Sequence, residues 1–265
     1  MVAFALWHEL RSPDFDALDA HTTVALLPLA AIEQHGPHLP LGTDALIVDA
    51  IVDAALKRSD DGLIIRLPTQ CIGLSPEHAS FRGTLTLDAE TVLAAWTGIG
   101  RCVHAAGLRK LVLFNGHGGQ TSIVDLVAQR LRQDRGLMVV RANYFRFALP
   151  PGWIGADERR FGLHGGQVET ALVLAIAPNL VDRREVGDFR SHAARLAQQS
   201  SVLAVEGEVG IAWQAEDLNA AGVTGNAARA TAEFGHRLLD HYAARLAGLL
   251  QDVVQVTFPP HAGGV

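Results

Sequence analysis

The sequence feature that most constrains the fold is an apolar run, Val24–Leu29, which leads into a cluster of ionisable side chains. The run has the length of one buried strand and no polar interruption, as parallel strands of α/β proteins do. The segment after it contains Glu33, His35, His38 and Asp44. Burying four such groups without a partner is costly, and a divalent metal ion is a partner that carboxylates and imidazoles share. This segment therefore predicts half of a metal site.

Strands and helices alternate along the rest of the chain. The expected strands are 24–29, 63–67, 111–114 and 137–140, and the expected helices are 43–58, 91–106, 121–135, a stretch from 164 to 178, and 226–250. This alternation predicts one α/β domain over residues 1–265, with a mainly parallel sheet covered on both faces. No linker long or polar enough to divide the chain is visible.

Two further segments carry candidate functional residues. His117 lies among glycines directly after the strand 111–114, and His164 precedes Glu169 in the first turns of a helix. Because loops at the carboxyl ends of parallel strands converge on one crevice, we expect Glu33, His35, Asp44 and His117 to meet there.

The expected ligand set, with Glu169 added, is too large for one tetrahedral zinc ion. It suits two metals about 3.5–4 Å apart, bridged by a carboxylate and a hydroxide. Asp44 is the expected bridge, because it lies between the other ligands in the sequence. Such a pair of ions would activate a water molecule, with His164 as the proton shuttle, and the reaction class is hydrolysis of an amide-like C–N bond.

The motifs that carry this chemistry resemble those of the creatininase (creatinine amidohydrolase) family. The matching segments are 33–40 (EQHGPHLP), Thr43-Asp44, 115–119 (NGHGG) and 164–170 (HGGQVET), in family order. The resemblance implies a three-layer αβα sandwich, a binuclear zinc, manganese or iron site, and a homo-oligomer, often a hexamer. It also implies metal ligation at Glu33, His35, Asp44 and His117, and a catalytic role for His164.

Several departures from creatininase concern the substrate. Creatininase has an aromatic residue and a ligating carboxylate after the histidine of its Asn-Gly-His motif, whereas this chain has Gly118 and Gly119. Glu169 is therefore our candidate for the fifth ligand. Two tryptophans of the creatinine pocket align with Phe145 and Arg160, so creatinine is not the expected substrate.

The Gly-Gly version is more similar to the branch with formylaminopyrimidine deformylases and the mycofactocin precursor peptidase. These enzymes act on formamides and on short peptides. We accordingly expect a small-molecule amide substrate, with Glu77, His78, Gly118 and Phe145 lining its pocket. The alternatives are a peptidase for a short, cofactor-precursor peptide and a metal-dependent lactone or sugar-ring hydrolase.

Other interpretations of the same residues are weaker. A phosphate cradle at residues 116–119 lacks both the G-x-x-x-x-G-K-[ST] and the G-x-G-x-x-G pattern. Glu33, His35 and Asp44 could instead form hydrogen bonds that cap the start of a helix. That interpretation would not explain why His117 and Glu169 also lie where a strand ends or a helix begins. His38 can be a ligand, can support the ligands without binding the metal itself, or can hydrogen-bond within its loop.

The composition limits the classes of binding partner that we expect. The net charge is −6 and the basic residues are scattered, which gives no reason to expect nucleic acid or an anionic membrane surface. No uncharged apolar run reaches the roughly 18 residues that span a bilayer. Cys71 and Cys102 have apolar neighbours in the sequence, from which we expect buried, reduced thiols and a cytoplasmic protein.

Overall fold

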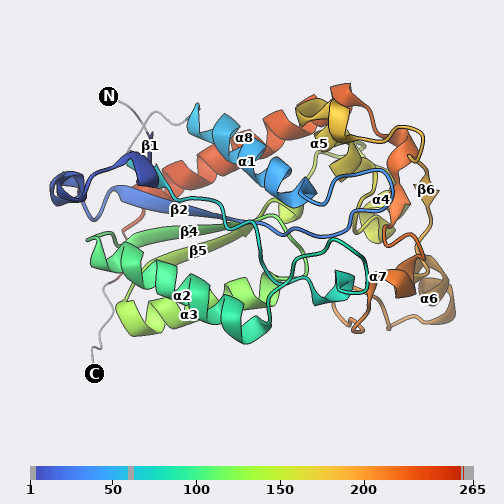
Figure 1. Cartoon of the computed structure of the whole chain (residues 1–265), viewed down its shortest axis with the longest axis horizontal. Helices are drawn as coiled ribbons and strands as arrows, with labels where there is room; N and C mark the ends of the chain where they lie inside the picture. The colour runs from blue at the N-terminus through green and yellow to red at the C-terminus, as the bar shows by residue number, and fades with distance from the viewer. Residues whose placement is uncertain (1–3, 59–62, 258, 260–265) are drawn as a thin grey trace.

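A computed structural model describes residues 4–58, 63–257 and 259 of the chain. At its centre lies a five-stranded sheet with the order β1-β3-β2-β4-β5, in which every pairing is parallel (Figure 1). The strands are β1 (Phe4–Leu6), β2 (Thr23–Leu29), β3 (Leu63–Arg66), β4 (Lys110–Asn115) and β5 (Met138–Asn143). The predicted α/β class and the four predicted strands are confirmed, while the short edge strand β1 was not predicted.

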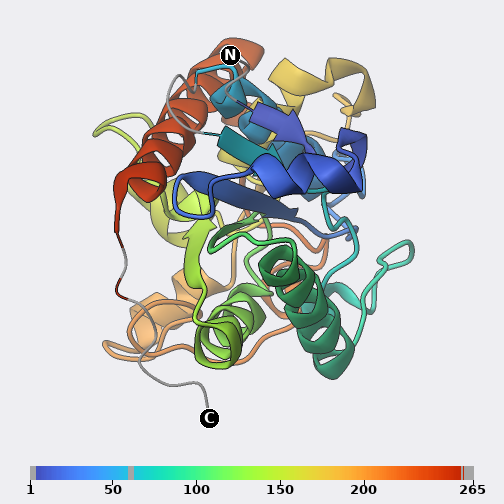
Figure 2. The same cartoon turned by 90° about the vertical axis from the view of Figure 1, so that its left-hand side faces the viewer.

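Helices cover both faces of this sheet. One layer contains α1 (Thr43–Leu56), α5 (Gln167–Ile176) and α8 (Ala232–Gln255), and the other contains α2 (Ala89–Ala105) and α3 (Thr121–Arg135). Figure 2 shows the sheet between the two layers. The fold is therefore the expected three-layer αβα sandwich.

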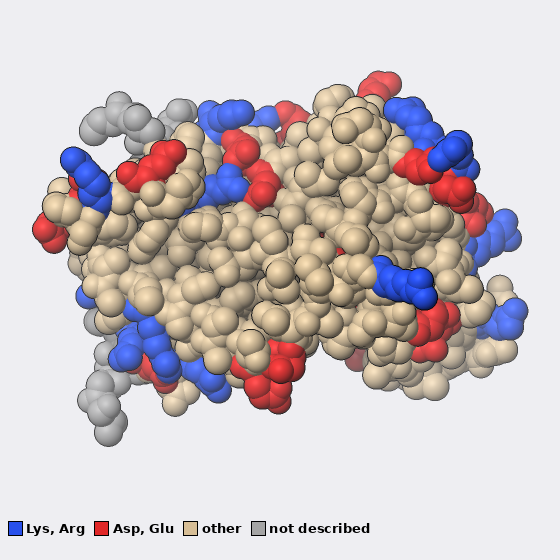
Figure 3. Space-filling view, viewed as in Figure 1, with Lys and Arg blue, Asp and Glu red and all other residues tan. Residues whose placement is uncertain are grey.

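The surface agrees with the composition in two respects. On the face drawn in Figure 3, basic side chains are dispersed, often beside acidic ones, around a centre of mostly uncharged residues. Within the described ranges, no helix combines the length and the apolar character needed to cross a bilayer.

The prediction of two buried thiols is wrong for Cys102, which is exposed on α2, and Cys71 is only partly buried.

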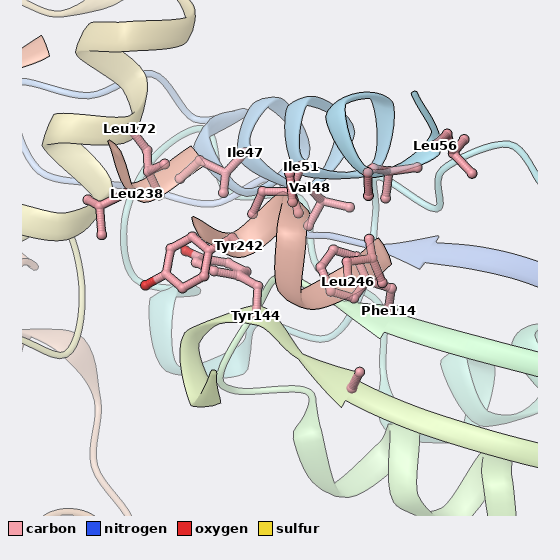
Figure 4. Close-up of a cluster of buried hydrophobic side chains, with 14 of the residues drawn as sticks. Ile47, Val48, Ile51, Leu56, Phe114, Tyr144, Leu172, Leu238, Tyr242 and Leu246 are labelled. Atoms are coloured by element: carbon pink, nitrogen blue, oxygen red, sulfur yellow. The ribbon is translucent and has the colours of Figure 1, made fainter. Parts of the chain in front are cut away.

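Strand β2 is buried on both sides because its residues alternate between two cores. Val24 and Leu26 pack with α1, α5 and α8, whereas Ala25 and Leu27 pack with α2 and α3. Figure 4 shows the first core, where Ile47 and other α1 side chains meet residues of β4 and α8. Each large aliphatic side chain buried in this way contributes about 1.5–3 kcal/mol. These two cores hold β2 and β4 rigidly side by side.

Smaller elements gather beyond the carboxyl ends of the strands, at the right of Figure 1. They are α4 (Ala156–Phe161), α6 (Ala193–Gln199), α7 (Ala215–Leu218) and the antiparallel pair β6 (Asp188–Phe189) and β7 (Gly225–Asn226). Short 3₁₀ helices occur at Trp7–Glu9, Ser12–Ala17, Pro76–His78, Tyr144–Arg146, Pro178–Leu180 and Ala227–Arg229.

The last helix begins later than the sequence pattern predicted. The expected start at Asn226 is wrong, because Asn226 belongs to β7 and pairs with Asp188. The helix begins at Ala232, where the Thr231 hydroxyl accepts a hydrogen bond from the backbone N–H of Phe234. A threonine cap of this kind stabilises a helix start by about 1 kcal/mol.

Candidate metal centre

The candidate site lies at the topological switch point of the sheet, where the connections from two adjacent strands leave on opposite faces. Strand β2 is adjacent to both β3 and β4, and α1 leaves it on one face while α3 leaves β4 on the other. Leu29 and Asn115, the last residues of β2 and β4, are directly paired. A crevice forms at such a switch point, beyond the carboxyl ends of the strands. The loops carrying Glu33 and His117 both start there.

Glu33 is fully buried at the centre of a ring of imidazoles. Its Oε1 lies 3.1 Å from Nδ1 of His117, 3.5 Å from Nε2 of His78 and 3.7 Å from Nδ1 of His164. Glu33 and these three histidines come from four separate segments of the chain. The sequence therefore predicted the convergence of Glu33 with His117 correctly, and it placed His164 near them as well.

Asp44 lies in the first turn of α1 and faces two different histidines. Its Oδ1 is 3.3 Å from Nε2 of His35, and its Oδ2 is 3.5 Å from Nδ1 of His117. The other ring nitrogen of His35, Nδ1, donates to the backbone carbonyl of Glu33 at 3.1 Å. Metal-binding histidines usually carry such a second hydrogen bond, which leaves one nitrogen free for the ion. His35 presents its Nε2 in this way.

Four atoms of this cluster are buried without a hydrogen-bond partner in the described part of the chain. They are Oε1 and Oε2 of Glu33, Nε2 of His35 and Oδ2 of Asp44. The neighbouring imidazole nitrogens are close, but the contacts do not have hydrogen-bond geometry. An unpaired buried polar group costs about 1–3 kcal/mol, and more if charged. A divalent cation fits this set of atoms, because carboxylate oxygen and imidazole nitrogen are its usual ligands.

Glu169, in the first turn of α5, lies on the His35 side of the cluster. Its Oε2 is 3.9 Å from Nε2 of His35 and accepts a hydrogen bond from the backbone N–H of Gly165 at 2.6 Å. Its Oε1 accepts one from the hydroxyl of Tyr144 at 3.3 Å. His35, His164 and Glu169 could together hold one ion. The structure thus brings all five predicted ligands to one place.

Glu77 and His117 meet because residue 119 is a glycine. Oε1 of Glu77 is 3.2 Å from Nε2 of His117, which is also hydrogen-bonded to the Ser75 hydroxyl at 3.3 Å. A Cβ on Gly119 would lie 1.7 Å from that same Glu77 oxygen. Glu77 therefore occupies space that any side chain at position 119 would need. Gly118, by contrast, borders open space.

The electrostatics of the cluster are strongly perturbed. Burial opposes the charged form of each group, but Asp44 raises the pKa of His35 to about 9, and Glu33 holds the pKa of His117 well above its usual range. Burial and the charge of Glu33 raise the pKa of Asp44 to about 6. Burial also lowers the pKa of His164. Shifts of this size, on geometry of this kind, are typical of functional sites.

His38 is not part of the ligand cluster. Its Nε2 lies 2.9 Å from the Thr170 hydroxyl and 3.1 Å from the carbonyl oxygen of Gly165. Its ring stacks on Phe189 with centroids 5.2 Å apart. The hydrogen bonds of His38 therefore reach the segment that carries Glu169, and the expected bond within its own loop is not the one that the structure shows.

The remaining predicted pocket residue, Phe145, lines a hollow beside the cluster. Phe145 is 39% exposed, and it lines a hollow of about 260 Å³ together with Tyr144 and Glu169. Arg160 lines a separate hollow of about 720 Å³ between α4, β6 and α6. Glu158 borders both hollows. Phe145 and Arg160 thus do not share one hollow.

Three residues that contact the cluster were not predicted from the sequence. Ser75 contacts His117, Tyr144 contacts Glu169, and Gln34 contacts both His78 and His164. Gln34 lies between two predicted ligands, so its position was a usable signal. Ser75 and Tyr144 reach the cluster only through tertiary packing, which no local pattern reveals.

The fold and the cluster define an α/β protein with a buried site suited to divalent metals. The sequence model of the family described as "Creatininase: Creatinine amidohydrolase" matches residues 8–250, and the chain belongs to the creatininase family. Among similar proteins, the mycofactocin precursor peptide peptidase of Mycobacterium ulcerans (strain Agy99) is 31% identical over 84% of this chain and 84% of its own length. The creatinine amidohydrolase of Pseudomonas putida is 31% identical over 68% of this chain and 75% of its own.

The fold of a solved structure supports the same assignment. A manganese form of creatininase superimposes with a TM-score of 0.76 at 25% identity, covering 97% of this chain and 100% of that chain. The chain is accordingly a hydrolase that acts on carbon–nitrogen bonds.

Proposed function

We propose that the chain is a binuclear metal-dependent amidohydrolase. Glu33, His35, Asp44, His117 and Glu169 would hold two divalent ions, which are zinc, manganese or iron, with Asp44 between them. The observation that carries this proposal is the set of buried, unpartnered ligand atoms on Glu33, His35 and Asp44. The manganese form of the similar creatininase structure supports it.

The chain's own residues would move the proton of the reaction. When bound, the ions would lower the pKa of a water molecule and polarise the substrate carbonyl. As the water oxygen bonds to the amide carbon, His164 would accept the water proton. As the C–N bond breaks, its electron pair stays on nitrogen, and His164 would return the proton to that nitrogen. The products are a carboxylic acid and an amine or ammonia.

The substrate that we propose is a small molecule with a formamide, a cyclic amide or another small amide bond. Glu77, His78, Gly118 and Phe145 would line its pocket. Phe145 and Arg160, at the positions of the two creatininase tryptophans, argue against creatinine itself. Open space at Gly118 and the hollow at Phe145 are consistent with a substrate that enters beside the cluster.

A short peptide is the second candidate substrate. The 31% identity to the mycofactocin precursor peptide peptidase favours it. The hollow of about 720 Å³ between α4, β6 and α6 favours it too, because Glu158 and Gly162 border both that hollow and the one at Glu169. A peptide could extend from the cluster across these two residues.

Metal analysis combined with a substrate panel tests the proposal. We expect about two zinc, manganese or iron ions per purified chain, and ammonia, formate or amine release from one class of amide. Formamides, cyclic amides, short peptides and lactones form the panel, so that the lactone alternative is tested with the others. A fully active, metal-depleted protein would disprove the proposed mechanism.

The homo-oligomeric state, with the hexamer as the form suggested by the family, stays a prediction, as does the cytoplasmic location. Light scattering of the purified protein measures the first directly.

A further inference from the structure

Gln34 lies between two of the predicted ligands, and its side chain hydrogen-bonds to Gly36, Gly222 and His78. The residue is 5% exposed. Its Oε1 accepts a hydrogen bond from the backbone N–H of Gly36 at 2.8 Å, and its Nε2 donates to the carbonyl of Gly222 at 2.6 Å. If the amide were flipped, two donors would face each other at Gly36 and two acceptors at Gly222. The backbone therefore fixes which end of the amide is the donor.

The fixed donor end faces His78. Nε2 of Gln34 is 2.7 Å from Nδ1 of His78. Because an amide nitrogen can only donate, Nδ1 must accept, and in a neutral imidazole the proton then lies on Nε2. That Nε2 is directed at Oε1 of Glu33, 3.5 Å away. His78 thus presents an N–H to the cluster, rather than a lone pair.

The backbone of the same residue contacts His164. Nε2 of His164 is 2.7 Å from the carbonyl oxygen of Gln34. A carbonyl can only accept, so Nε2 carries the proton and Nδ1 carries the lone pair. Nδ1 lies 3.7 Å from Oε1 of Glu33. The rings of His78 and His164 stack with centroids 4.2 Å apart and an angle of 27° between their planes.

We propose that Gln34 is a positioning residue that fixes how His78 and His164 face the cluster, with His78 as a hydrogen-bond donor and His164 as a proton acceptor. One residue achieves both, through its side-chain amide and its main-chain carbonyl. The assignment of chemical roles rests on the proposed function, whereas the two tautomers follow from the hydrogen bonds alone.

The two imidazoles would then serve different steps. The free Nδ1 of His164 would accept the proton from the attacking water and return it to the leaving nitrogen. The Nε2–H of His78 would donate a hydrogen bond to the substrate oxygen on which negative charge develops, a contribution that grows in the transition state. His78 in this tautomer is unsuited to bind a cation through Nε2, although it lies close enough to Glu33 and His164 to be considered a ligand.

Gly222 supports this arrangement. Its φ is +74°, in the left-handed region that favours glycine, and a Cβ there would lie 2.5–2.7 Å from the amide atoms of Gln34. The amide of Gln34 is thus enclosed by backbone on two sides. Gly222→Ala would displace it without changing any residue of the cluster.

Nitrogen NMR of the zinc-loaded protein tests the inference, because zinc is diamagnetic and each tautomer has its own pattern of ring shifts. The probe is the protein labelled with ¹⁵N-histidine. The chain has 12 histidines. His78→Gln and His164→Gln variants assign the two spin systems by loss of their signals. We expect the ring proton on Nε2 in both residues, with Nδ1 of His78 unprotonated. A wild-type spectrum with the proton on Nδ1 of His78 or of His164 would overturn the inference, and this measurement does not depend on whether any variant at position 34 folds.

Gln34→Glu is the decisive variant. An ionised carboxylate only accepts, so His78 should move its proton to Nδ1, whereas His164, which is held by the backbone, should not change. We expect kcat to fall by about 10–10² with little change in KM, since a donor to the developing charge is lost. Gly222→Ala should lower kcat as well.

Gln70→Glu is the matched control, because the side-chain amide of Gln70 donates to the carbonyl of Pro68 and hydrogen-bonds to no histidine among the described residues. It should leave both tautomers and kcat unchanged. An unchanged His78 tautomer in a folded Gln34→Glu protein would refute the role of Gln34. Expected tautomers in a protein that hydrolyses no amide would instead refute the proposed function and leave the tautomer assignment intact.

Discussion

Among single residues, Asp44 makes the clearest link between local structure and metal binding. It lies in the first turn of α1, and each of its oxygens faces a different histidine. Asp44→Asn replaces an anionic ligand by a neutral one, so we expect more than about 90% of the bound metal to be lost, with the activity. Elemental analysis after gel filtration measures this. Asp53→Asn, on the exposed side of the same helix, should keep its metal, and equal retention in both variants would exclude Asp44 from the site.

His164 is predicted to act on the proton and not to be needed for holding the ions. His164→Ala should retain the metals and lower kcat by about 10²–10⁴. Steady-state kinetics with metal analysis of the same sample gives both quantities. His236→Ala, on α8, is the control and should match the wild type. Unchanged turnover in His164→Ala would remove this residue from the mechanism.

His38 should make the protein sensitive to acid. Burial lowers its pKa to about 4, from an ordinary value of 6.5. Between about pH 4 and 6.5 the unfolded chain therefore binds a proton at His38 that the folded chain does not, so stability falls as the pH drops through this window. His38→Gln should remove about 1–3 kcal/mol of this pH dependence. Urea unfolding of metal-free wild type and variant at pH 7 and pH 4.5 measures it; parallel curves would contradict the expectation.

At the level of helices, the close approach of α8 to α5 depends on Gly235. A Cβ at this position would lie 1.8 Å from the carbonyl oxygen of Ala171 on α5. Gly235→Ala should therefore separate the helices and lower the free energy of unfolding by about 1–3 kcal/mol. Gly248→Ala, in the same helix with nothing within 4 Å, should raise it by about 0.5–1 kcal/mol. Thermal and urea unfolding should give changes of opposite sign, and stabilisation by both would disprove the packing argument.

The sequence predicted regular elements well where local signals were strong. Helix α3 has the predicted bounds Thr121–Arg135, and β2 extends the predicted strand by one residue. The signals failed where tertiary pairing decides the structure. Residues 225–226 form a strand only because Asp188 and Phe189 lie beside them, and the three residues of β1 are held by β3.

In the candidate site, too, local patterns identified some residues, whereas tertiary contacts decide the positions of others. Glu33, His35 and Asp44 could be identified from their spacing after an apolar strand. The position of Glu77 beside His117, by contrast, depends on the missing side chain at Gly119, and Tyr144 reaches Glu169 from the end of another strand. Such contacts join residues far apart in sequence, and a linear pattern does not encode them.

For the whole molecule, the cluster ties together segments that the sheet alone does not join. Ions at the proposed site would stabilise only the folded state, by about 2.7 kcal/mol at a free concentration 100 times Kd. We expect Tm to rise with added zinc or manganese and to fall with a chelator, as calorimetry can measure. The Tm of Asp44→Asn should not respond. A wild-type Tm that is independent of metal would argue against ions at this site.

The distribution of the predicted ligands along the chain, from Glu33 to Glu169, has a consequence for biosynthesis. A growing polypeptide on the ribosome acquires Glu33, His35 and Asp44 early, but it lacks a complete set of ligands until α5 has emerged. Any nascent chain arrested before that point would, on the proposed ligand set, capture a cation only weakly. If the site binds metal as proposed, loading would therefore be a late event for each new molecule, and the supply of ions would matter at the end of translation rather than during it.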